Sequence, residues 1–141
     1  MPALLNNVVI TAPVTAVVGP VLQVRSPIGI PTNVGVQVTF NYGSGGTSGT
    51  VWLQTSFDGG STWCDVGAIA LALASLRTLF NVSSLTPKTT AAAATDGTLA
   101  AGTVNDGIVG SQWRCKYTTV GTYAGNTTLN VDMEASGVTS L

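Results

Sequence analysis

The sequence predicts an all-β protein, with one β-sandwich or jelly-roll-like domain over residues 33–141. Residues 1–32 precede it as an extended N-terminal arm or as edge strands. Polar and apolar residues alternate with a period of two in several short segments, which is typical of half-buried strands. Turn-forming residues separate these segments at short intervals, as they do in sandwiches and jelly rolls. No long amphipathic helical pattern competes, and 141 residues suit one domain with its own core.

The N-terminal segment is apolar but irregular. Short β-branched pieces at residues 8–11 and 14–18 are separated by prolines, which cannot donate a hydrogen bond to a neighbouring strand. The prolines of this segment are Pro2, Pro13, Pro20, Pro27 and Pro31. Two interpretations stay open: edge strands of the same domain, or an arm that lies on a neighbouring subunit.

The clearest strand pattern covers residues 34–42. Its apolar positions are Val34, Val36, Val38, Phe40 and Tyr42. A loop rich in Gly and Ser follows at residues 43–49 and leads to a second strand at 51–55. A turn at 58–61 then leads to a third piece at 63–66, so residues 51–66 are predicted to form a hairpin.

Two later stretches are harder to assign. In residues 68–74 the large residues alternate, which favours a strand, but the alanines between them favour a helix. Residues 76–82 resume the strand pattern. Residues 84–103, which we call the excursion, are rich in Thr and Ala, and we expect a long loop with a short helix over residues 89–94.

Two strong strand patterns close the chain. Their apolar positions are Trp113, Cys115 and Tyr117 in the first, and Leu129, Val131 and Met133 in the second. The opposite positions are all polar, among them Arg114 and Lys116 in the first strand and Asp132 and Glu134 in the second. We therefore expect that side of the sheet to face water.

Charge is scarce along the whole chain. Only 8% of the residues are charged, against roughly 25% in an average protein, and the formal net charge is −1. Five cations are too few for a nucleic-acid footprint, and no apolar run is long enough for a membrane span. The first cation is Arg25, so a charged leader is not expected and synthesis should take place in a host cytoplasm. A surface this poor in charge suits a protein that partners cover.

The two cysteines, Cys64 and Cys115, are too few for a disulfide framework or a zinc site. Each lies within two residues of a Trp in a predicted strand. Two interpretations stay open: small buried apolar residues, or a disulfide between neighbouring strands. The chain has no histidine that could activate a thiol.

The most specific motif fits the pattern Ser-x-Asp-x-Gly-x-Thr-Trp and consists of Ser56, Asp58, Gly60, Thr62 and Trp63. In such a turn the carboxylate accepts backbone N–H bonds, the glycine supplies a positive φ, and the Trp packs beneath the hairpin. The pattern resembles the Asp-boxes of sialidase propellers, but one copy in a chain of this length leaves no room for a propeller. We predict a structural turn and not part of a glycosidase.

No other cluster of residues predicts catalysis, a cofactor or a metal site. Asp58, Asp96 and Asp106 each precede a glycine, which indicates turns, and Asp132 and Glu134 share one strand face, which indicates a solvated surface. A glycosidase would need two carboxylates that face each other across a cleft. The prediction is therefore a protein without enzymatic activity, without a cofactor and without a bound metal.

Two aromatic residues are candidates for contact with a partner or a glycan. Trp52 lies on the opposite strand face from Val51 and Leu53, and Tyr123 lies in a predicted turn. If solvent reaches them, either ring could stack on a sugar. The alternative for Trp52 is a buried layer of a two-sheet sandwich.

Four motifs in a fixed order resemble the small structural proteins that tailed bacteriophages encode near their capsid genes. They are residues 54–63, residues 95–99, Asp106-Gly107, and residues 121–125. The resemblance covers about two-thirds of the chain, from Val36 to Glu134, and leaves out residues 1–32. It implies a component of the virion that coats the head, and it supplies no catalytic residues.

The leading hypothesis is thus a capsid decoration, or cement, protein that binds the major capsid protein on the virion surface and stabilises the phage head. It would bind there as a homo-oligomer, with a trimer favoured over other symmetric clusters, and it would bind no nucleic acid or membrane. A second hypothesis is a head-tail connector, tail or fibre component of the same virion. A third, from a different class, is a carbohydrate-binding β-sandwich module that uses Trp52 or Tyr123.

Overall fold

The computed structural model describes residues 3–23 and 29–140 and contains only strands and loops in those residues. The strands in chain order are β1 (Ala3–Val9), β2 (Val14–Val18), β3 (Leu22–Gln23), β4 (Gly29–Asn41), β5 (Ser44–Gly45), β6 (Ser48–Ser56), β7 (Cys64–Leu71), β8 (Leu76–Ser83), β9 (Gln112–Val120), β10 (Tyr123–Ala124) and β11 (Thr128–Ser140).

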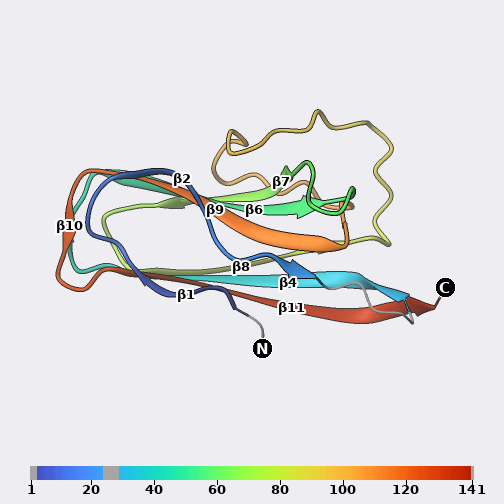
Figure 1. The fold of residues 1–141 in the computed structure, drawn as a ribbon, viewed down its shortest axis with the longest axis horizontal. Coiled ribbons are helices and arrows are strands. Elements are labelled where there is room, and N and C mark those ends of the chain that lie inside the picture. The colour runs from blue at the N-terminus through green and yellow to red at the C-terminus, as the bar shows by residue number, and fades with distance from the viewer. Residues whose placement is uncertain (1–2, 24–28, 141) are drawn as a thin grey trace.

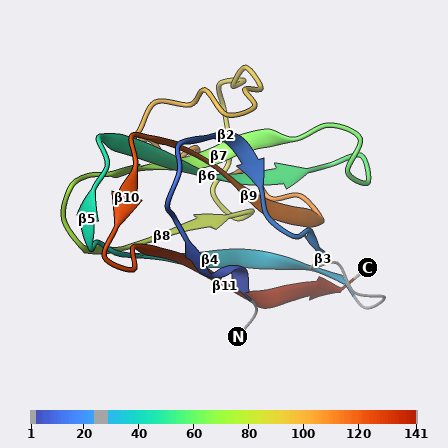
Figure 2. The same cartoon turned by 60° about the vertical axis from the view of Figure 1, so that its left-hand side comes forward.

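Two antiparallel sheets form the two layers of a sandwich (Figure 1). One sheet has the order β1-β11-β4-β8, and the other has the order β2-β9-β6-β7, with β3 also paired to β9. The short strands β5 and β10 pair with each other at one end of the molecule (Figure 2). The all-β sandwich that the alternation predicts is confirmed, and the jelly-roll topology stays a prediction.

The core lies between the two sheets, where the alternating apolar residues of both meet. Val36, Val38 and Phe40 of β4 point inward, as do Trp113 of β9 and Val131 of β11, and all are buried. Each such side chain contributes about 1.5–3 kcal/mol through burial of its apolar surface. The period of two in the sequence therefore fixes which face of each strand becomes core.

The N-terminal segment runs along the edges of both sheets of its own chain. β1 pairs with β11 in one sheet, and β2 and β3 pair with β9 in the other. Leu4, Leu5 and Ile10 are buried in the core. Of the two alternatives for this segment, the described residues form edge strands; Pro2 and Pro27 lie outside the described residues.

Both ambiguous stretches are resolved without a helix. Residues 68–71 belong to β7, so the strand alternative holds there, and the chain then turns into β8. The short helix expected over residues 89–94 is wrong, because the excursion has no helical segment. A helix of six residues gains too few hydrogen bonds to offset its nucleation. The backbone of the excursion bonds instead to the edge of β7.

Candidate functional site

The turn between β6 and β7 is held by the side chains of the Asp-box pattern. Asp58 accepts hydrogen bonds from Ser56 Oγ at 2.9 Å, from the backbone N–H of Thr62 at 2.8 Å and from the Thr62 hydroxyl. The Ser56 hydroxyl in turn accepts the N–H of Gly60, whose φ is +94°. These bonds close the turn locally, so the motif acts as a structural element at the end of the hairpin.

The same hydrogen bonds favour the charged form of Asp58. The side-chain bond from Thr62 is the largest cause, followed by the backbone bond from Thr62 and the bond from Ser56, and together they lower the pKa of Asp58 to about 2. Asp58 is therefore a fixed acceptor at neutral pH and not a proton donor.

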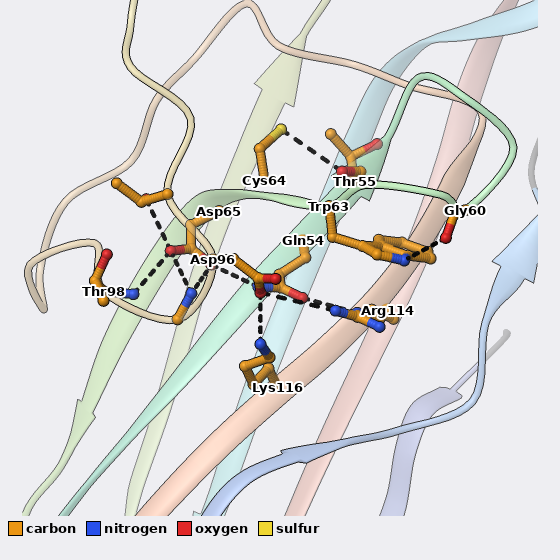
Figure 3. Close-up of polar contacts among 12 residues, drawn as sticks. Gln54, Thr55, Gly60, Trp63, Cys64, Asp65, Asp96, Thr98, Arg114 and Lys116 are labelled. Carbon is orange, nitrogen blue, oxygen red and sulfur yellow. Dashed lines mark hydrogen bonds and ion pairs between the residues drawn. The ribbon is translucent and has the colours of Figure 1, made fainter.

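Trp63 links this turn to the outer face of the second sheet. Its indole N–H donates to the Gly60 carbonyl at 3.1 Å, and the guanidinium of Arg114 lies 4.4 Å from the ring centroid. Such cation–π contacts stabilise by about 0.5–2 kcal/mol, depending on solvent exposure. The turn is thus connected to a group of charged residues on neighbouring strands (Figure 3).

Five polar residues gather on this face, and we call them the Asp65 cluster: Gln54, Asp65, Asp96, Arg114 and Lys116. Gln54 lies on β6, Asp65 on β7, and the two cations on β9, whereas Asp96 belongs to the excursion (Figure 3). Gln54 is central, because its amide N–H₂ donates to both carboxylates, at 2.8 Å to Asp65 and 2.6 Å to Asp96. Its carbonyl accepts Arg114 Nε at 2.8 Å.

Asp65 is almost completely buried, with only 2% of its surface exposed. Its carboxylate accepts the backbone N–H groups of Gly97, Thr98 and Leu99 at 2.8–3.2 Å. It also accepts the Thr95 hydroxyl at 2.9 Å. The Asp65 carboxylate is thus the hydrogen-bond acceptor for the donors of one bend of the excursion. A hydrogen bond to a charged group is about twice as strong as one between neutral groups.

Asp96 forms ion pairs with both cations of β9. It contacts Lys116 Nζ at 2.5 Å and Arg114 Nη2 at 3.7 Å. Burial works to raise the pKa of Asp96, but the hydrogen bonds from Lys116 and Gln54 and the two positive charges outweigh it, so the pKa lies below its usual value of 3.8. For Arg114, desolvation outweighs the attraction of Asp96 and Asp65 and lowers the pKa.

The excursion and the two residues that follow it, Val104 and Asn105, also pair with the backbone of β7. Gly67 forms a β-bridge with Val104, next to a series of backbone hydrogen bonds. These bonds run from Asp65 N to Thr95 O, Ala68 N to Thr103 O, Gly102 N to Ala68 O, and Asn105 N to Val66 O. The free edge of β7 is thereby covered by the protein itself, which is a common protection against pairing with other chains.

The expectation that the polar side of β9 faces water is wrong. The side chains of Arg114 and Lys116 are only 15% and 11% exposed, because Asp96 and the rest of the excursion lie over them. The sequence shows that this face is polar, but it does not show that a distant loop returns to cover it.

The two aromatic candidates for a glycan or partner contact are both buried, which for Trp52 agrees with the alternative of a buried layer. Trp52 is 8% exposed, and its indole N–H donates to the Leu99 carbonyl at 2.9 Å beneath the excursion. Tyr123 is 2% exposed, and its hydroxyl donates to the Ser48 carbonyl at 3.0 Å. Neither ring offers a face on which a sugar could stack.

The cysteines do not form a disulfide. Cys64 on β7 pairs with Thr55 of β6, and Cys115 on β9 pairs with Leu53 on the other side of β6. The two cysteines are thus two strand spacings apart across the sheet and two residues apart along it, roughly 11–12 Å in all, which is too far for a bridge. Cys115 is a buried apolar residue, and Cys64 is half-buried. Burial raises the pKa of both thiols, so neither is a reactive thiolate.

Asp132 and Glu134 lie on the outer face of the first sheet and border an open hollow of about 440 Å³ beside Gly35 and Leu79. Asn130 donates to Asp132 at 2.7 Å. Over residues 3–23 and 29–140, no three His, Cys, Asp or Glu side chains are arranged to hold a metal ion. Within the same ranges, no helix has the length and apolar character of a membrane span.

No family model, curated protein or solved structure matches this chain. The assignment of a function therefore rests on the residues and their geometry. The Asp65 cluster is the most organised polar group that the structure describes, and each of its members serves to hold the excursion. Sequence reasoning missed this cluster, although the signal was present: four of the chain's eleven charged residues are Asp65, Asp96, Arg114 and Lys116.

Proposed function

We propose that this protein is a structural component of a phage virion, a decoration protein that binds the major capsid protein and stabilises the head. The motif order from Val36 to Glu134 suggests the virion, and the geometry supports a passive binding role. The side chains of the Asp65 cluster are engaged in holding the excursion, and Trp52 and Tyr123, the two aromatic residues considered for sugar stacking, are both buried. The surface left for function is therefore weakly charged and partly apolar.

The observation that carries this proposal is the apolar character of the exposed surface. Among the residues that the structure describes, nine large hydrophobic ones are exposed: Val9, Val18, Val21, Phe57, Leu73, Leu79, Leu85, Val104 and Val120. Charged residues make up only 8% of the chain, and several of them are covered by the excursion. Surfaces that become buried between subunits are depleted in charge in the same way.

Such a surface would stabilise a shell because apolar area is buried wherever the protein contacts the major capsid protein. Burial of apolar surface contributes roughly 25 cal/mol per Å² before the cost of association, and a specific contact typically buries about 800 Å² on each partner. Many copies on a closed shell would add this energy at every site. The hydrophobic core lies within a single chain and does not need the capsid contact in order to form. The protein would therefore be able to fold first and bind after the shell has formed.

The test is to add the purified protein to phage heads that lack it. We expect saturable binding, a copy number that follows the symmetry of the major capsid protein, and a higher temperature of head disruption. Heads that neither bind the protein nor gain stability would overturn the proposal. A connector, tail or fibre component would instead appear at one vertex or on the tail only, which particle reconstruction would show.

The carbohydrate-binding alternative is weaker, because its two proposed stacking residues, Trp52 and Tyr123, are inaccessible. Glycan-array binding by the intact protein would revive it through another surface. Loss of that binding on Phe57→Ala, the most exposed aromatic side chain of the described residues, would locate the contact.

A further inference from the structure

The sheet edges of this sandwich are protected in different ways. The edge of β7 is covered by the excursion. β1 and β2 are interrupted by register shifts and by positive φ angles at Asn7 and Ala16, and Pro13 and Pro20 flank β2. Bulges and prolines of this kind prevent a strand from pairing with another chain.

β8 has none of these protections. It pairs with β4 from Leu76 to Ser83 without a register shift, so it is a regular strand at the edge of its sheet. The hydrogen bond from Ser84 N to Thr32 O fixes the phase of this pairing. In an antiparallel pair, every second residue directs its backbone N–H and C=O to the same neighbouring strand. Ser84 and the even-numbered residues of β8 bond to β4, so the N–H and C=O groups of Arg77, Leu79 and Asn81 point away from β4.

The open part of this edge has a definite end. The backbone N–H of Ser83, the next residue in the same phase, donates to Asp106 Oδ1 at 2.7 Å. Asp106 therefore closes the edge at Ser83, and the open backbone groups are centred on Leu79. The Leu79 side chain is 61% exposed, although it lies within a strand.

We propose that β8 pairs antiparallel with β8 of a second copy of this chain, across a two-fold axis at Leu79. Leu79 then lies opposite Leu79 of the second copy, and Arg77 lies opposite Asn81 of the second copy. The pairing makes about six backbone hydrogen bonds from groups that have no other ladder partner. It joins two four-stranded sheets into one continuous sheet.

The side chains around this edge make it complementary to itself. With this register no like charges lie opposite each other, because Arg77 meets the neutral Asn81. The row across the sheet from Asn81 passes Gly35, which has no side chain, and reaches Glu134. Arg77 of the second copy lies opposite Asn81 and so extends this row, next to the hollow that Asp132 and Glu134 border. In the described part of the chain, neither carboxylate has an ion-pair partner of its own.

This inference goes beyond the proposed function and does not depend on it, because it requires no capsid. A two-fold contact predicts a dimer in solution, in contrast to the trimer that the sequence favours. The two tests are therefore independent: the protein could dimerise without binding to heads, or bind to heads without dimerising.

Sedimentation and light scattering over a range of concentrations test the pairing directly. We expect a reversible dimer for the native chain and a monomer for Leu79→Lys, which places two ammonium groups at the axis. Leu85→Lys is the matched control, because Leu85 is 75% exposed and lies just beyond β8. It should dimerise as the native chain does. Asn81→Asp should tighten the dimer by roughly 2- to 30-fold through two opposite-charge pairs.

A crosslinking experiment tests the register. In a Cys64→Ser background, Leu79→Cys should form an intermolecular disulfide on mild oxidation, because directly opposed residues lie about 5.5 Å apart. Leu85→Cys in the same background should not. A native chain that stays monomeric, a trimer that Leu79→Lys leaves intact, or equal crosslinking at both positions would overturn the proposal. Circular dichroism and thermal unfolding of each variant establish that it is folded.

Discussion

The outer faces of the two sheets differ in what covers them. The face formed by β6, β7 and β9 carries the Asp65 cluster and lies beneath the excursion, which bonds to it through both side chains and backbone. The face formed by β4, β8 and β11 carries Gln37, Leu79 and Asp132 and is open, with a free strand edge beside it. On the first face Asp96 forms ion pairs with Arg114 and Lys116, whereas in the described residues Asp132 and Glu134 of the second face have no ion-pair partner.

The largest effect should come from removal of Asp65. We expect Asp65→Ala to lower the free energy of unfolding by about 3 kcal/mol or more, because several backbone N–H groups and Gln54 lose a buried charged acceptor. Urea unfolding measures this loss. Asp132→Ala on the open face is the control and should change stability by at most about 0.5 kcal/mol. Equal effects of the two substitutions would remove the distinction between the faces.

A smaller effect is expected at Trp52, which lies beneath the excursion. Trp52→Phe keeps most of the apolar cover but loses the hydrogen bond to the Leu99 carbonyl, so the expected loss is about 1 kcal/mol. Amide hydrogen exchange should become faster at residues 95–105 while the core strands β4 and β11 stay protected. Uniformly faster exchange would show that the excursion and the core unfold together.

The third prediction concerns pH and Asp96. Its pKa is lower in the folded protein than the usual 3.8, so its pairing stabilises the fold fully above that value. The contribution is lost as the pH falls from 3.8 through the lowered pKa. Asp96→Asn should therefore be less stable than the native chain at neutral pH, with a difference that shrinks in acid. Half of the Asp96 side chain is exposed, so solvent screening keeps the effect small. Thermal unfolding from neutral pH to about pH 2 measures it; a difference that does not change with pH would contradict the charge pairing.

The smallest effect is expected on the open face itself. Leu79→Lys should leave the free energy of unfolding of the monomer within about 0.5 kcal/mol of the native value, because the side chain is largely exposed. Unfolding of dilute protein, where a dimer would dissociate, is the appropriate measurement. A large loss of stability under those conditions would mean that Leu79 packs within its own chain.

The sequence by itself determined the strands and their inward faces. The alternation in residues 34–42, 112–118 and 128–134 predicts which side chains form the core, because the side-chain period of a strand is two and the apolar residues occupy one face. The Asp58 turn was also accessible, since all of its bonds join residues within a few positions of each other. Local physics suffices for both features.

Only the tertiary structure decided what lies over each sheet. Asp65 and Leu99 are 34 residues apart, and Gln54 and Arg114 are 60 apart, so no local pattern reveals that the excursion returns to β7 and buries Trp52. The same holds for the edges: the alternation in residues 76–82 identifies a strand, but its place at the end of a sheet depends on which strands pair with β4. Periodicity reports the two faces of a strand, and the neighbours of each face and edge are set by long-range pairing.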